Sequence, residues 1–174
     1  CPGSDAALLA RAFHFVSGFN VSWFYRGTPS QQFGCWDSPV TEIRLPARNL
    51  TGTVSWKFLA NITRLRAVDL SGNYLTGSLP PSIWLVPSLA EFNLSHNRLG
   101  GAAGLPRAGF PAVGPVRSID VSFNRFKSLG FFSDFVNLTN LDVSGNDFAA
   151  VLPFWFANFT NLEFLAFAGC NFSG

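Results

Sequence analysis

The sequence contains no methionine and few charged residues. Charged side chains make up 13% of the 174 residues, the formal net charge is +2, and the lysines and arginines are scattered along the chain. A chain without a basic run lacks the electrostatic footprint of a protein that binds nucleic acid or an anionic membrane surface. Because the chain begins at Cys1 and has no methionine, we expect a mature or trimmed protein whose signal peptide has been removed.

Long uninterrupted apolar runs are also missing. The most apolar segment, residues 151–172, is broken by Asn158, Thr160, Asn161 and Glu163, so it does not have the pattern of a membrane span. Apolar residues nevertheless make up 48% of the chain, which is enough for a continuous core. Twenty phenylalanines indicate a fold that stacks large flat side chains repeatedly.

Motifs for catalysis are absent from the sequence. There is no Gly-x-Ser-x-Gly, no phosphate-binding glycine-rich loop and no His-Glu-x-x-His. The two histidines, His14 and His96, are far apart in sequence and are expected to face solvent. We therefore predict no enzymatic activity, no metal site and no cofactor.

Glycosylation sequons are abundant. Asn-x-Ser/Thr occurs seven times, and a part of that excess reflects a repeated Asn-Leu-Thr/Ser pattern. The pattern favours a secreted glycoprotein. The sequons predicted to carry glycans are Asn20, Asn49, Asn61, Asn137, Asn158 and Asn171, and the seventh, Asn93, is predicted to be the least occupied.

One template, L-x-x-L-x-L-x-x-N-x-L-x-G, fits the chain six times. Its first position falls at residues 40, 65, 89, 116, 138 and 162, so the intervals are 25, 24, 27, 22 and 24 residues. Periods of this length are typical of leucine-rich repeats. The positions three and six residues before the template are also apolar, and they are Leu59, Ile62, Ile83, Val86, Phe110, Val113, Phe132, Phe135, Phe156 and Phe159.

The repeat predicts an α/β leucine-rich-repeat solenoid, a right-handed curved stack of parallel strands with an N-terminal helical cap. Each repeat contributes one short strand to the concave side, a buried Asn after the strand, and apolar residues to the convex side. We expect residues 1–39 to form the cap and residues 40–174 to form five full repeats and a partial sixth. Asp69, Asp120 and Asp142 share one template position, which favours a structural role.

The first residues carry the signals of a capping helix. Ser4 and Asp5 can cap a helix that runs from Ala6 to about Val16, and Gly18 can end it. Leu9, Phe13 and Val16 would then share the face that covers the first repeat.

The repeats resemble those of plant leucine-rich-repeat receptor kinases and receptor-like proteins. Residues 75–80, Leu-Thr-Gly-Ser-Leu-Pro, resemble the family's L-T-G-x-I-P signature, and residues 69–73, Asp-Leu-Ser-Gly-Asn, resemble its D-L-S-x-N. The likeness covers residues 40–174 and is strongest to receptor-like kinases with short ectodomains. Residues 5–9 resemble the D-x-x-A-L-L opening of the family's cap, but the second Cys that usually follows Cys35-Trp36 is missing.

This resemblance implies an extracellular recognition domain at the plasma membrane. Its expected partners are a peptide or small-molecule ligand, another leucine-rich-repeat ectodomain, or both, with the membrane span and the kinase outside this chain. We expect the natural protein to continue past Gly174, because no polar capping repeat closes the solenoid. The candidate ligand-binding residues on the concave face are Arg44, Arg66, Asp69, Glu91, Asn93, His96, Arg117, Asp120, Phe123, Asn140, Asp142 and Phe164.

Two other functions fit the same repeats. A secreted inhibitor of a cell-wall-degrading enzyme, of the polygalacturonase-inhibitor type, would need further repeats and a closing Cys-rich cap. A structural cell-wall adhesion module would bind wall polymers only.

The three cysteines leave at least one thiol unpaired within the chain. Cys170 occupies the Asn position of its repeat, where the family tolerates a small buried side chain, so it is the expected free thiol. Because the usual local partner of Cys35 is missing, we predict a disulfide between Cys1 and Cys35.

Overall fold

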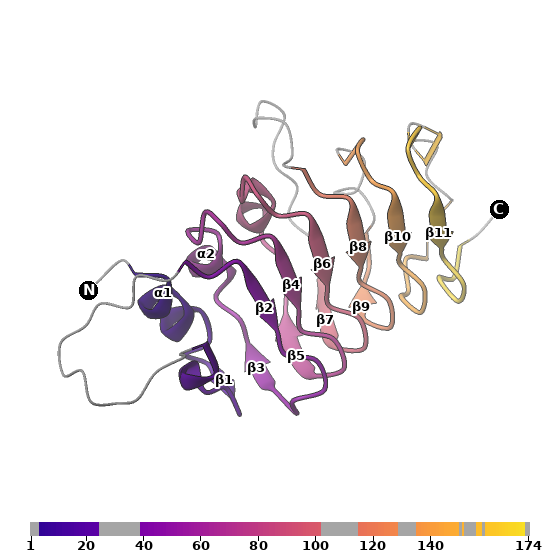
Figure 1. The fold of residues 1–174 in the computed structure, drawn as a ribbon. Coiled ribbons are helices and arrows are strands. Elements are labelled where there is room, and N and C mark those ends of the chain that lie inside the picture. The colour runs from indigo at the N-terminus through magenta and orange to yellow at the C-terminus, as the bar shows by residue number, and fades with distance from the viewer. Residues whose placement is uncertain are drawn as a thin grey trace, which may run out of the picture.

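The computed structural model describes residues 4–24, 39–101, 115–128, 135–149, 151, 156–157 and 159–172. The repeats stack side by side from the N-terminal cap to the C-terminal end (Figure 1). Two sheets line this stack: one has six strands, and the other has five strands, from residues 16–17 to residues 125–126.

The larger sheet has six parallel strands, one from each template match, as predicted. Its order is β11-β10-β8-β6-β4-β2, so strands from successive repeats are neighbours. Equivalent template positions pair in register, as Ile43 does with Val68 and Val68 with Phe92. The strands are β2 (Glu42–Arg44), β4 (Ala67–Asp69), β6 (Glu91–Asn93), β8 (Ser118–Asp120), β10 (Asn140–Asp142) and β11 (Phe164–Ala166).

The template did not predict a second sheet, which has five short strands. It contains β1 (Val16–Ser17), β3 (Thr51–Thr53), β5 (Tyr74–Gly77), β7 (Arg98–Gly101) and β9 (Arg125–Phe126). β1 pairs antiparallel with β3, and the other pairs are parallel. Gly52 is required here, because its φ is +112° and a Cβ would lie 2.0 Å from the carbonyl oxygen of Phe15.

The core is formed by side chains from the two sheets and from the short helical segments that precede the strands of the larger sheet. Among the described residues three and six positions before the template, Leu59, Ile62, Ile83, Val86, Phe135 and Phe159 are buried and Phe156 is partly buried, while Phe110, Val113 and Phe132 lie outside the described residues. Trp84 packs edge-on against Phe92 and against Phe135, each at a centroid distance of 4.9 Å. The aromatic content is therefore used in stacking between repeats.

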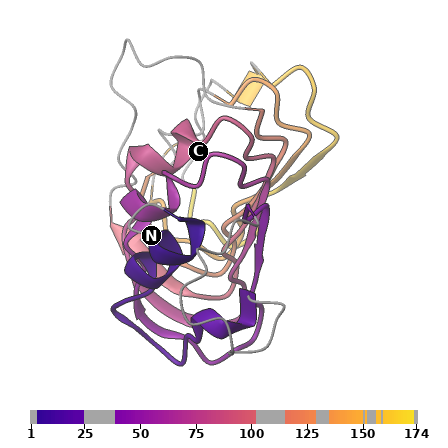
Figure 2. The ribbon, with the colours of Figure 1, turned by 60° about the vertical axis from the view of Figure 1, so that its left-hand side comes forward.

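Short helical segments occupy the side opposite the six-stranded sheet (Figure 2). They are α2 (Trp56–Leu59) and η2 (Pro81–Leu85). The cap contributes another short helix, η1 (Val21–Phe24), in which the ring centroid of Trp23 lies 5.3 Å from Cζ of Arg48. None of the helices in the described part of the chain is long and apolar enough to cross a bilayer.

A ladder of buried asparagines ties the repeats together. The Nδ2 group of Asn97 donates to the carbonyls of Leu94 and of Leu70 in the preceding repeat, and its Oδ1 accepts from the N–H of Leu75. The same pattern recurs at Asn73, Asn124 and Asn146. The predicted role of the Asn position, to satisfy turn backbone groups of neighbouring repeats, is confirmed.

The capping helix is shorter than predicted. α1 spans Asp5–Ala12, and its N-cap is Ser4, whose hydroxyl accepts a hydrogen bond from the N–H of Ala7. The helix does not reach Val16, because Val16 lies in β1 and pairs with Gly52. Burial was predicted correctly, since Leu9, Phe13 and Val16 all lie in the core.

The carboxylate of Asp5 connects the cap to the first strand. Its Oδ2 accepts from the N–H of Val40 at 2.7 Å. The predicted cap also includes Cys1 and Cys35, which lie outside the described residues, so the predicted disulfide and the boundary at residues 39 and 40 stay predictions.

Candidate functional site

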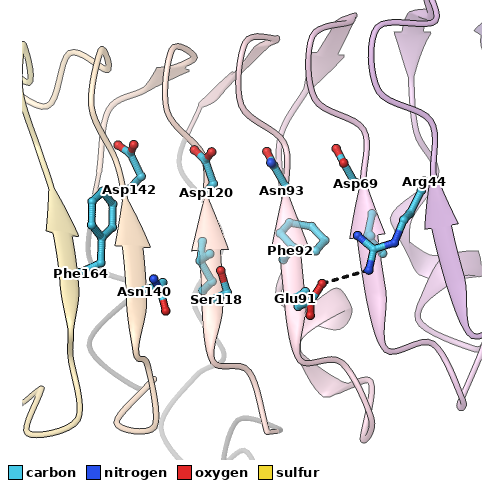
Figure 3. A pocket seen from close by; sticks show the side chains of 12 residues that line it. Arg44, Asp69, Glu91, Phe92, Asn93, Ser118, Asp120, Asn140, Asp142 and Phe164 are labelled. Atoms are coloured by element: carbon cyan, nitrogen blue, oxygen red, sulfur yellow. Dashed lines mark hydrogen bonds and ion pairs between the residues drawn. The ribbon is translucent and has the colours of Figure 1, made fainter.

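The concave face of the six-stranded sheet carries two rows of outward side chains. In β2, β6, β8 and β10 the middle residue enters the core, so its two neighbours face outward. At the last strand, β11, the middle residue Leu165 is partly exposed. The leading row consists of Glu42, Ala67, Glu91, Ser118, Asn140 and Phe164. The trailing row, at the strand ends, consists of Arg44, Asp69, Asn93, Asp120, Asp142 and Ala166 (Figure 3).

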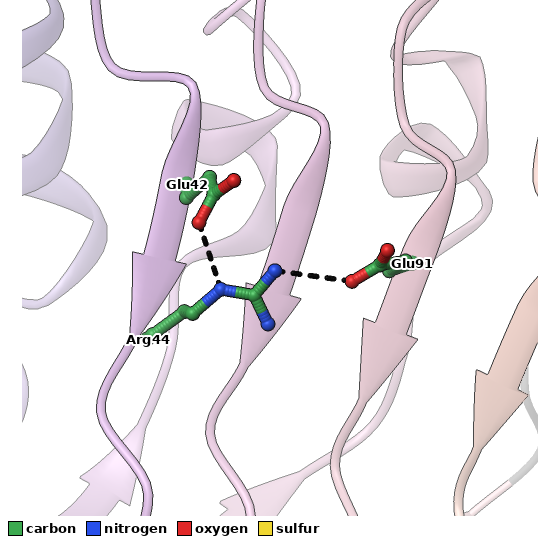
Figure 4. A network of polar contacts seen from close by, with 3 residues as sticks. All are labelled: Glu42, Arg44 and Glu91. Carbon is green, nitrogen blue, oxygen red and sulfur yellow. Dashed lines mark hydrogen bonds and ion pairs between the residues drawn. The ribbon is translucent and has the colours of Figure 1, made fainter.

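Arg44 bridges two glutamates across three strands (Figure 4). Its Nε lies 2.8 Å from Oε2 of Glu42, and its Nη2 lies 3.1 Å from Oε2 of Glu91. Ala67 stands between Glu42 and Glu91 in the leading row, and its small side chain leaves room for the Arg44 guanidinium to reach both glutamates. The hydrogen bonds to Glu42 and then to Glu91 raise the pKa of the Arg44 guanidinium. Because all three side chains are exposed, the network fixes their positions more than it stabilises the fold.

The aspartates of the trailing row support the turns that follow the strands. Oδ1 of Asp69 accepts from both the N–H and the hydroxyl of Ser71, and Asp120 binds Ser122 in the same way. Asn93 makes the same two contacts with Ser95. The structural role expected for these aspartates is therefore present, and it uses one oxygen of each carboxylate.

A groove of about 560 Å³ runs across the sheet. Its lining includes eight of the predicted residues, which are Arg44, Asp69, Glu91, Asn93, Asp120, Asn140, Asp142 and Phe164. Sequence reasoning missed Val68, Phe92 and Ile119, and it placed Ser118 on the concave face without naming it as a ligand-binding candidate. The strand pattern carried the signal for Val68, Phe92 and Ile119, because a groove floor between outward rows is formed by the residues between them.

The other four predicted residues lie outside this groove. Arg66 and Arg117 precede β4 and β8 at the strand starts, and Arg117 lines a second hollow of about 660 Å³ with Asn137, Thr139 and Glu163. His96 and Phe123 follow the trailing row, and their rings stack at a centroid distance of 4.4 Å.

A third hollow lies on the cap, where sequence reasoning placed no site. Its volume is about 410 Å³, and Arg11, His14, Phe15, Lys57 and Phe58 are among its lining residues. Arg11 lies 4.2 Å and Lys57 lies 5.0 Å from the centroid of Phe58. Within the described residues, no group of His, Cys, Asp or Glu side chains is arranged to hold a metal ion.

Comparison with known proteins decides the family. The Leucine Rich Repeat model matches residues 64–85 and 137–159. The ectodomain of the receptor kinase SOBIR1 from Arabidopsis thaliana is 30% identical, with a TM-score of 0.64 over 75% of this chain and 68% of that one. The chain belongs to the leucine-rich-repeat ectodomains of plant receptor kinases.

Other relatives of this ectodomain agree with that assignment. Calmodulin-binding receptor kinase CaMRLK of Arabidopsis thaliana is 41% identical over the whole chain, which spans 25% of that protein's length. Receptor-like protein 32 of the same plant is 35% identical over 72% of the chain and 14% of its own length. The BIR2 ectodomain shares the fold, with a TM-score of 0.65 at 23% identity. The ectodomain is thus a non-catalytic, extracellular or cell-surface recognition fold.

The glycosylation sequons of the ectodomain differ in exposure. Asn20, Asn49, Asn61, Asn137 and Asn171 are exposed, and Asn158 lies outside the described residues. Asn93 is only partly exposed, lies in β6 and lines the groove. A glycan on Asn93 would therefore project over the concave face.

Cys170 is a buried free thiol, as expected. Its Sγ lies 3.2 Å from the carbonyl oxygen of Val143 in the preceding repeat. Burial raises the pKa of the thiol, so the sulfur keeps the proton that it donates.

Proposed function

We propose that this ectodomain recognises an extracellular ligand or partner through its concave face, as the outer part of a plasma-membrane receptor-like kinase. The groove across the six-stranded sheet supports this proposal most directly. Its outward side chains come from successive repeats and carry both charges and an aromatic ring, Phe164, which is 51% exposed. Few of these outward positions are needed to hold the repeats together, so they are free to specify a ligand.

The chemistry of the groove fits a peptide or a protein surface. Glu91, Asn140 and Ser118 offer hydrogen-bond donors and acceptors, while Phe164 offers a flat apolar contact. The receptor kinase HAESA, which shares the fold at 20% identity with a TM-score of 0.61, was solved with the peptide hormone IDA and the co-receptor SERK1. A related complex, BIR3 with SERK2, joins two such proteins and matches this chain at 22% identity with a TM-score of 0.67.

The relatives favour a receptor over a secreted inhibitor. CaMRLK is similar along the whole chain, and its remaining length leaves room for other domains. We infer that a membrane span and a kinase domain accompany this ectodomain in its natural protein.

Binding to a defined panel tests the proposal. The panel contains secreted plant peptides, purified leucine-rich-repeat ectodomains and cell-wall polysaccharides, and binding is measured by biolayer interferometry. Ser118→Arg places a large cation between Glu91 and Asn140 in the groove. Its matched control is Ser78→Arg, at an exposed serine after β5.

We expect Ser118→Arg to abolish the interaction that the unaltered chain shows, and Ser78→Arg to retain it. Equal binding by the unaltered chain and Ser118→Arg would place recognition on another surface. An unaltered chain that bound only wall polysaccharides would instead identify an adhesion module.

A further inference from the structure

One turn position has a left-handed backbone in every repeat of the concave sheet. Its φ values are +51° at Ala47, +65° at Gly72, +54° at His96, +51° at Phe123, +65° at Gly145 and +66° at Gly169. Glycine adopts this conformation without steric cost, whereas bulky L-residues rarely do. At two of these positions the chain nevertheless carries a ring.

Neither ring is held there by burial. Phe123 is 53% exposed, and His96 is also exposed. The turn itself is fixed by backbone bonds, since the N–H of His96 donates to the carbonyl of Ser122 and that of Phe123 to Ser144. Because glycine makes the equivalent bond at Gly72 and Gly145, the fold does not require an aromatic side chain at this position.

The two rings form a stacked pair at the surface, and the equivalent turn position of the repeat before His96 is a glycine. They are nearly parallel, with an interplanar angle of 10°. The far side of Phe123 is covered by Gly145, where an added Cβ would lie 2.7 Å from Cδ1 of the ring. The far side of His96 faces the turn of Gly72, which has no side chain, and the three atoms nearest to a Cβ built there all belong to Ala47. The outer face of His96 is therefore not covered by a side chain from the equivalent position.

The charged residue nearest to Gly72 along the concave strand of the same repeat is negative. Asp69 ends the strand that leads into Gly72, and only its Oδ1 is engaged, by Ser71. Arg44, the one cation that lines the groove, is bound by Glu42 and Glu91 of the leading row. Arg66 stands at the opposite end of β4. A ligand group that fits here is thus flat and positively charged.

We propose that the outer face of His96, above Gly72 and beside Asp69, is a subsite for an arginine side chain of a peptide ligand. This inference rests on the proposed recognition function and names one feature of its ligand. A guanidinium group stacks on aromatic faces and donates paired hydrogen bonds to carboxylates, which a lysine ammonium does less well. Phe123 acts as a positioning residue that holds the imidazole from behind.

The two histidines make the subsite directly observable. A full chain labelled with ¹³C at histidine Cε1 gives two signals, and His14, on the cap, serves as an internal control. The chain is titrated with N-acetyl-Gly-Arg-Gly amide. The same peptide with citrulline in place of arginine keeps the shape of the side chain and removes its charge.

We expect a saturating shift of the His96 signal with the arginine peptide, at least about tenfold weaker binding of the citrulline peptide, and an unmoved His14 signal. Asp69→Asn should weaken arginine binding about tenfold. This change preserves the turn, because Asn93 makes the same contacts with Ser95 in the neighbouring repeat. Asp147→Asn, at an exposed aspartate outside the groove that pairs with Lys127, is the control and should bind as the unaltered chain does.

A His96 signal that does not move, or that moves equally with both peptides, would overturn the arginine subsite. So would equal losses from Asp69→Asn and Asp147→Asn. Each of these results leaves the proposed function intact if Ser118→Arg abolishes binding to the panel.

Discussion

The thiol of Cys170 takes the place of an asparagine amide toward Val143. In four preceding repeats, an Asn Nδ2 donates to a carbonyl one repeat earlier, as Asn146 does to Val121. Cys170 offers one weak S–H donor to the equivalent carbonyl of Val143. The ladder therefore continues into the last described repeat with a poorer donor and without the acceptor that an amide supplies.

Replacing Cys170 tests this role. Cys170→Ala should lower the free energy of unfolding by about 1 kcal/mol, because it leaves the carbonyl of Val143 unpaired and a small gap. Cys170→Asn should match or exceed the stability of the unaltered chain. Urea unfolding followed by circular dichroism measures both changes. Lower stability of the Asn variant than of the Ala variant would contradict the ladder role.

The same thiol predicts a pH dependence. Burial raises the pKa of the Cys170 thiol in the folded chain. The stability that the protonated thiol contributes is therefore fully present below the pKa of the thiol in the unfolded chain, and it is lost as the pH rises through the pKa of the thiol in the folded chain. Cys170→Ala should lack this alkaline loss.

The buried asparagines should contribute far more than exposed ones. Asn97→Ala removes the partners of Leu70, Leu75 and Leu94 in the interior, and we expect a loss of about 2–4 kcal/mol in unfolding free energy. Asn161 is exposed, with a single bond to Val136, and Asn161→Ala should cost less than about 0.5 kcal/mol. Similar losses from both changes, measured by urea unfolding, would mean that the ladder does not hold the repeats together.

Two glycines at the same turn position should respond differently to alanine. Gly145 and Gly169 have φ values of +65° and +66°, so each Ala variant should lose about 1–2 kcal/mol through backbone strain. At Gly145 the new Cβ also meets the ring of Phe123 at 2.7 Å, whereas at Gly169 the nearest atom is 3.9 Å away. Gly145→Ala should therefore cost about 1 kcal/mol more. Adding Phe123→Gly should remove that excess in a double-mutant cycle, and an excess that persisted would contradict the stacked arrangement.

The disulfide prediction concerns residues at the start of the cap. Non-reducing peptide mapping should recover the peptides of Cys1 and Cys35 linked to each other, and Cys170 should be alkylated only after unfolding. A disulfide that closes the loop from Cys1 to Cys35 would stabilise the cap by roughly 3–4 kcal/mol in the chain-entropy model. Recovery of Cys170 linked to either of the others would refute the pairing.

The sequence predicts the concave sheet well because each strand has a fixed apolar position and a fixed period. Ile43, Val68 and Phe92 pair in the register that their spacing dictates. The second sheet is harder to predict, because strands such as Thr51–Thr53 expose residues on either side of a glycine and show no apolar alternation. The glycine of the Leu-Thr-Gly motif indicates that another backbone segment approaches closely at this position, but it does not by itself predict a strand.

Two local features depended on contacts across the fold. The spacing of Leu9, Phe13 and Val16 suits one helix face, yet pairing of Val16 with Gly52 ends the helix earlier. Both His96 and Phe123 were predicted to lie on the concave face, but their stacking could be predicted only from the fact that they share one turn position in adjacent repeats. The repeat template already assigns both residues to that position.

Glycan occupancy at Asn93 tests the central claim most directly. Asn93 lies in the trailing row among the groove residues, and a glycan there would cover the proposed recognition face. Glycopeptide mapping of the ectodomain secreted from plant cells should find Asn93 the least occupied sequon, with Asn20, Asn61, Asn137 and Asn158 mostly glycosylated. Full glycosylation of Asn93 in a chain that still binds its partner would contradict recognition through the concave groove.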